Sequence, residues 1–171
     1  ARPAPTLLQI SDLGTGMFYS GKSHMLIGPS ESGKSWLALC AVREALRAGG
    51  SVLYVDFEDD ERTMEERLTA LGVTDAELAG LAYVSPDGPL FALSQARPVP
   101  TKDWPVFQRL AQGRALVVFD GVNEALALHG LNMNVATEVA HLLSLLRAVS
   151  RSTGAAVVGI DHVSKESAKE G

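Results

Sequence analysis

Residues 28–35 of the chain read Gly28-Pro29-Ser30-Glu31-Ser32-Gly33-Lys34-Ser35. This segment matches the phosphate-binding pattern G-x-x-x-x-G-K-[ST] at every specified position. It follows the short apolar run Ser23–Ile27, which predicts a strand, and it opens the alanine- and leucine-rich segment Lys34–Ala48, which predicts a helix. A strand, a glycine-rich loop and a helix in this order are the context that gives the pattern its meaning. The alternative is a chance glycine turn before a helix, and the full context disfavours it.

The physical chemistry of this loop suits the phosphates of ATP and a bound Mg²⁺ ion. Glycines let the backbone wrap closely around phosphate, and successive N–H groups form an anion-binding nest. The helix that begins near Lys34 directs the positive end of its dipole at the same charge. We expect Lys34 to reach the β- and γ-phosphates and the Ser35 hydroxyl to ligate Mg²⁺. The residues predicted to bind the nucleotide are the loop itself and the next side chain, which we expect to pack beside it: Gly28, Pro29, Ser30, Glu31, Ser32, Gly33, Lys34, Ser35 and Trp36.

The rest of the chain alternates apolar runs with amphipathic segments, which is typical of an α/β protein with a mainly parallel twisted sheet flanked by helices on both faces. A Pro- and Gly-containing stretch, residues 86–100, predicts a surface loop. Asn134 is a candidate cap for a long helix that ends at Gly154. We expect a single domain over residues 1–171, with residues 1–6 as a disordered lead-in. The remaining predicted strands are Ser51–Phe57, Leu81–Ser85, Ala115–Phe119 and Ala155–Ile160, and the remaining predicted helices are Asp60–Leu71 and Asp103–Gln112.

Composition restricts the class of protein. The net charge is −5, which argues against a broad nucleic-acid surface, although a small basic loop could still bind one. The single cysteine, Cys40, excludes an internal disulfide framework and suits a reducing compartment. No apolar run reaches the roughly 18 residues of a membrane span, and the start shows no signal-peptide pattern. These features favour a cytoplasmic protein, and the missing initial Met suggests an excised domain.

The segment Leu116-Val117-Val118-Phe119-Asp120 is an apolar strand that ends in an acid, the Walker B pattern. Asp120 would emerge at the carboxyl edge of the sheet, where open α/β folds bind ligands. There it could hold Mg²⁺ through water. Alone this pattern is weak, because many buried strands end in an Asp that caps a turn. The phosphate-binding loop upstream favours the functional interpretation.

Glu58 follows the strand Ser51–Phe57, so its carboxylate is also predicted at the carboxyl edge. A carboxylate there could orient the water that attacks the γ-phosphate. The acids that follow it, residues 59–61, more simply stabilise the N-terminus of the next helix, and Asp56 within the strand is interpreted as structural.

The last predicted strand runs into Asp161 and His162 at the same edge. Either side chain could sense the γ-phosphate and move a loop, and a loop histidine with ordinary hydrogen-bond partners is an equal alternative. Arg62, four residues past Glu58, could stack on the adenine, or it could be a solvated or ion-paired arginine. The other histidines, His24, His129 and His141, lack the spacing of metal ligands.

Together these signals resemble the RecA-like P-loop ATPases, and within them the AAA ATPase branch that includes the hexameric plasmid helicase RepA. The segments that carry the resemblance are GPSESGKSWLAL, VLYVDFEDDERT, LVVFDGVNEALALHG and AAVVGIDHVSK, and it extends from about Leu7 to Gly171. It implies that Glu58 activates water, that Asp120 is the Walker B acid, and that His162 is a sensor on a strand between the P-loop and Walker B strands. Such motors have further strands and a trans-acting arginine beyond this point, so we expect a fold truncated at its C-terminus.

The leading hypothesis is therefore an ATP-hydrolysing motor that works as a hexameric ring on single-stranded DNA. The alternatives are a nucleotide-dependent switch and, third, a small-molecule kinase, which the strand-end Glu58 and the lack of an arginine-rich lid weaken. Candidate DNA contacts are two loops after the sensing acids, His129–Asn134 and Ser164–Lys169, the second with Lys165 and Lys169.

Overall fold

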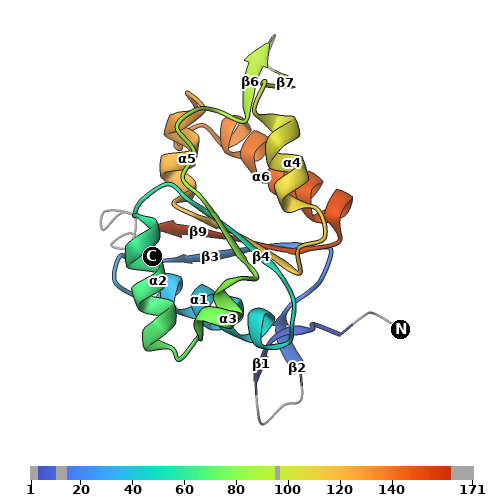
Figure 1. The fold of residues 1–171 in the computed structure, drawn as a ribbon. Coiled ribbons are helices and arrows are strands. Elements are labelled where there is room, and N and C mark those ends of the chain that lie inside the picture. The colour runs from blue at the N-terminus through green and yellow to red at the C-terminus, as the bar shows by residue number, and fades with distance from the viewer. Residues whose placement is uncertain (1–3, 11–14, 95–96, 163–171) are drawn as a thin grey trace.

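The centre of the molecule is a sheet of five parallel strands (Figure 1). In the computed structural model, residues 4–10, 15–94 and 97–162 are described. The sheet confirms the five predicted strands, and the strand of Asp161 and His162 lies between the P-loop and Walker B strands as the resemblance implied. From one edge to the other, the strands are β3 (Ser23–Gly28), β9 (Ala156–His162), β8 (Leu116–Asp120), β4 (Val52–Asp56) and β5 (Leu81–Val84).

Helices cover both faces of this sheet (Figure 1). One face carries α1 (Lys34–Arg47), α2 (Glu61–Ala70) and the short α3 (Asp75–Leu78). The other carries α4 (Trp104–Ala111), α5 (Val122–Leu128) and α6 (Ala136–Thr153). Among the described residues, no helix combines the length and the apolar character needed to cross a membrane.

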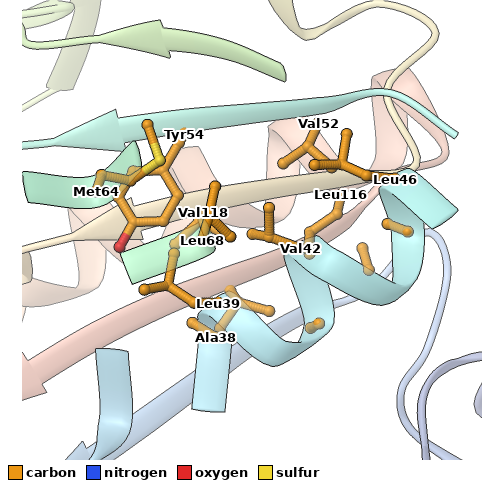
Figure 2. Close-up of a cluster of buried hydrophobic side chains, with 14 of the residues drawn as sticks. Ala38, Leu39, Val42, Leu46, Val52, Tyr54, Met64, Leu68, Leu116 and Val118 are labelled. Carbon is orange, nitrogen blue, oxygen red and sulfur yellow. The ribbon is translucent and has the colours of Figure 1, made fainter. Parts of the chain in front are cut away.

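Strand β4 shows why the strands are continuous apolar runs. Side chains alternate between the two faces of a strand. Val52 and Tyr54 pack on α1 and α2 in the cluster of Figure 2, whereas Leu53 and Val55 pack on the side of α4 and α6. All five residues of β4 are buried, because both faces of the sheet are covered.

Among the described residues, two β-hairpins lie outside the central sheet, and the sequence predicted neither. Residues 86–100 were predicted as a surface loop, which is wrong in part: β6 (Phe91–Ser94) and β7 (Arg97–Pro100) pair antiparallel. A two-stranded ribbon leaves its outer edges unpaired, so prolines do not disrupt it. The second hairpin is β1 (Leu7–Ile10) with β2 (Thr15–Phe18). The N–H of Thr6 donates to the carbonyl of Phe18, and the N–H of Gly16 donates to the carbonyl of Pro5. Pro5 and Thr6, which were expected in the disordered lead-in, therefore belong to this hairpin.

Two local expectations around α5 and α6 are wrong. Asn134 does not cap α6, since the helix begins one residue later, after Val135, which makes no side-chain cap bond. His129 is not an exposed loop residue, because it is only 8% exposed and hydrogen-bonded on both ring nitrogens. Burial therefore removes His129 as a DNA contact, and Leu131 in the same segment is also buried.

Candidate nucleotide-binding site

The carboxyl ends of four neighbouring strands bring the predicted site residues together. The backbone register pairs Gly28 of β3 with His162 of β9, and Asp56 of β4 with Asp120 of β8. The loop 28–33 leaves β3 at this edge and enters α1 through Gly33, whose φ of 83° is favourable only for glycine. The helix thus begins directly at the phosphate-binding loop.

Lys34 lies inside the curve of the loop. Its side chain is buried to 8% exposure. Its Nζ donates to the carbonyl oxygens of Gly28 at 2.9 Å and Pro29 at 2.6 Å. It also lies 3.1 Å from Nδ1 of His162, on the neighbouring strand. The loop therefore holds one buried ammonium group at the point where phosphate oxygens would enter.

Ser35 and Asp120 form the corner predicted to hold Mg²⁺. The Ser35 hydroxyl donates to Oδ1 of Asp120 at 3.5 Å, and Tyr54 OH donates to Oδ2. Burial raises the pKa of Asp120, and the hydrogen bond from Tyr54 opposes this rise. A hydroxyl and a carboxylate at one sheet edge are the oxygen ligands that Mg²⁺ prefers, so these residues fit the ion.

Asp56, the register partner of Asp120, has a different task. Its Oδ1 accepts the backbone N–H groups of Glu58 at 3.0 Å and Asp59 at 2.9 Å. These bonds stabilise the turn after β4, which gives Asp56 a structural role. Asp60 likewise caps α2 by accepting the N–H of Thr63.

Glu58 reaches His162 from this turn. Nε2 of His162 lies 3.0 Å from Oε1 of Glu58, and the two side chains are 28% and 29% exposed. Because Nζ of Lys34 can only donate, Nδ1 of His162 acts as the acceptor, and the Nε2–H group donates to the carboxylate of Glu58. Burial raises the pKa of Glu58, the bond from His162 lowers it, and the nearby Glu124 raises it. The sequence thus predicted three residues, Lys34, His162 and Glu58, that the fold places in one contact chain.

A cavity of about 320 Å³ lies over the loop. Its walls include Trp36, which is 45% exposed, and Arg67 of α2, which also bonds to Asp59 at 3.0 Å. Arg62, the predicted adenine contact, is 87% exposed and pairs with Glu66 instead, and it does not line this cavity. The complete lining is Glu31, Ser32, Gly33, Lys34, Ser35, Trp36, Arg67 and His162.

Helical spacing could have found Arg67. Met64 and Leu68 are the buried residues of α2. Arg67 lies three residues past Met64 and next to Leu68, so it shares the side of the helix that faces the protein. Arg62 lies two residues before Met64, which places it on the opposite side. No sequence signal pointed to Tyr54, because it bonds to Asp120 on a neighbouring strand, and the two residues are 66 positions apart in the chain.

Within the part of the chain that the structure describes, no group of three His, Cys, Asp or Glu side chains could hold a metal. Ser164–Lys169, the second candidate DNA segment, lies outside the described residues.

The loop, the two strand-end acids and the strand order define a RecA-like P-loop ATPase domain. The chain belongs to the AAA domain family, whose model matches residues 4–168. A stretch of 67 residues is also 46% identical to Protein RecA of Corynebacterium jeikeium (strain K411). That stretch is 39% of this chain and only 17% of the length of that relative.

Proposed function

We propose that this ATPase domain is the motor of a ring helicase or translocase that acts on single-stranded DNA. The observation that carries this proposal is the contact chain Lys34–His162–Glu58, with gaps of 3.1 Å and 3.0 Å. A γ-phosphate bound by Lys34 would compete with His162 for the ammonium group. The chain segment that follows His162 would respond to nucleotide, as a motor requires. The resemblance to the branch of the plasmid helicase RepA supports the proposal that this response to nucleotide drives a motor.

In the proposed reaction, water attacks the γ-phosphorus of ATP and the bond to the β–γ bridging oxygen breaks. Glu58 accepts a proton from the attacking water, and ADP and phosphate leave. Lys34 donates to the phosphate oxygens and His162 positions Glu58. Ser35 and Asp120 are the residues that would hold Mg²⁺, which when bound neutralises charge on the phosphates.

The base and sugar of the nucleotide have candidate partners in the same cavity. Trp36 is exposed there, and Arg67 of α2 also lines the cavity. Arginine stacks on planar rings and also pairs with phosphate, so Arg67 replaces Arg62 as our candidate for nucleotide contact.

Single-stranded DNA would be contacted by loops, because the net charge of −5 provides no general attraction for phosphate. We propose that Ser164–Lys169 contributes Lys165 and Lys169, and that six copies in a ring bring these loops together. The same charge favours the second candidate, a switch whose ATP state controls a protein partner.

The test is ATP turnover by the full-length protein with and without single-stranded DNA. The motor predicts that DNA stimulates turnover and that Lys165→Ala reduces this stimulation, most at low salt. Lys22→Ala is the matched control, since the exposed Lys22 directly precedes β3, at the amino end of the strands and away from the carboxyl edge. Turnover that is indifferent to DNA under every condition would contradict the motor and favour the switch.

A further inference from the structure

Tyr54 lies in the middle of β4 and is only 1% exposed (Figure 2). Its ring packs in the cluster between the sheet and helices α1 and α2. The parallel register pairs Tyr54 with Val118, so Asp120, two residues further along β8, is on the same face of the sheet. A tyrosine side chain spans this diagonal distance, and its hydroxyl reaches Oδ2 of Asp120.

The two oxygens of Asp120 therefore have different partners. Oδ2 accepts from Tyr54, which comes from within the core, and Oδ1 accepts from Ser35, which opens α1. The terminal torsion of an aspartate is soft, so one bond alone leaves the carboxylate free to rotate. The second bond, from Tyr54, restrains the orientation of the carboxylate plane, with one oxygen toward the core and the other toward Ser35 and the loop. Partners of this kind orient metal ligands in many proteins.

We propose that Tyr54 is a positioning residue for the candidate Mg²⁺ site, holding Oδ2 of Asp120 so that Oδ1 faces Ser35. This inference rests on the proposed function, because it assigns a role to Tyr54 only if Ser35 and Asp120 hold the ion.

A purely structural role is the competing explanation. A buried phenol needs a hydrogen-bond partner, and Asp120 supplies one whatever else it does. Both roles predict some loss of stability when the hydroxyl is removed. Only the positioning role predicts that tight nucleotide binding requires a higher Mg²⁺ concentration while metal-free binding is unchanged.

Tyr54→Phe removes the hydroxyl and keeps the ring that fills the core. Tyr83→Phe is the matched control: its ring stacks on Tyr54 with centroids 6.4 Å apart, and its hydroxyl donates to the backbone of Asp59 instead. The affinity for a fluorescent ATP analogue is measured in EDTA and across a Mg²⁺ titration, with thermal melting as the check on folding.

The Mg²⁺ midpoint of Tyr54→Phe should rise about tenfold, with unchanged affinity in EDTA, whereas Tyr83→Phe should match the wild type. A Tyr54→Phe midpoint equal to that of the wild type overturns the inference and leaves the ATPase proposal intact. A wild type with no Mg²⁺ effect would overturn the metal site itself, and this inference with it.

If Tyr54→Phe does not fold, 3-fluorotyrosine at position 54 changes the acidity of the donor in the same ring. A shifted Mg²⁺ midpoint then supports the role, and an unchanged midpoint overturns it.

Discussion

At the carboxyl edge of the sheet, Gly121 leaves no room for a side chain of its own. It follows Asp120 with a φ of 91°, and a β-carbon there would lie 2.7 Å from Cγ of Glu58 and 3.1 Å from Oε2 of Glu124. Any other residue would push Glu58 away from the end of β8. The absence of a side chain at position 121 therefore lets the proposed catalytic carboxylate lie beside the Walker B strand.

The bond between His162 and Glu58 leads to a prediction about pH. Burial raises the pKa of Glu58 and His162 lowers it, so His162→Ala leaves burial unopposed. The proposed role requires the carboxylate form. Turnover by the full-length variant should therefore be lost at a higher pH than in the wild type as the solution is acidified. The measurement is kcat/KM against pH.

Glu58→Gln serves as the control for this profile. It should retain ATP affinity and lose about 10²- to 10⁴-fold in turnover, because the amide is a poor acceptor for a proton from water. An acid limb at the same pH in His162→Ala and wild type would show that Glu58 does not control it. Normal hydrolysis by Glu58→Gln would place the catalytic carboxylate elsewhere, with Glu124 the nearest candidate.

The element α5 connects the site to the hairpin of β6 and β7. At its start, Asn123 donates to the carbonyl of His162 at 3.2 Å. At its end, Nδ1 of His129 donates to Ala125 and Nε2 accepts the N–H of Leu90 at 3.0 Å. The ring also lies 4.4 Å from that of Phe91, the first residue of β6. His129 thus ties the helix to the base of the hairpin.

We predict that the contact between His129 and the segment at Leu90 weakens in mild acid. Burial lowers the pKa of His129 from 6.5, so the unfolded state binds the proton more readily than the folded state. Stability should therefore fall as pH drops below about 6.5, with a slope of at most about 1.4 kcal/mol per pH unit for this one group. His129→Gln should flatten that slope in urea unfolding between pH 5.5 and 7.5. His141→Gln on α6 is the matched control, and an equal slope in both variants would rule out His129 as the source.

The elements differ in how far sequence could predict them. The central strands were predictable because buried parallel strands are continuous apolar runs, and acids at their ends mark the site. The hairpin of β6 and β7 was not, because its prolines indicate a loop unless the strand is known to lie on a free edge. His129 was misplaced for a related reason: one of its partners, Phe91, begins that unpredicted hairpin, and the other, Leu90, directly precedes it.

In the whole molecule, two helical layers enclose the sheet (Figure 1). The carboxyl edge of the sheet carries the loop 28–33, Asp120, Glu58 and His162. The buried strands of this sheet hold these groups at its carboxyl edge. Lys34 is central to this arrangement, because its buried side chain contacts both the loop and His162 on β9.

The most direct measurement is the titration of a fluorescent ATP analogue, with Mg²⁺ present, into the wild-type protein and Lys34→Ala. In the proposed site, Lys34 would supply charged hydrogen bonds to phosphate, so its loss should weaken binding by at least about tenfold. Lys22→Ala at the opposite sheet edge should bind like the wild type, and melting curves should show that both variants are folded. Equal affinity and equal turnover of Lys34→Ala and wild type would contradict the assignment of this loop as the ATP site.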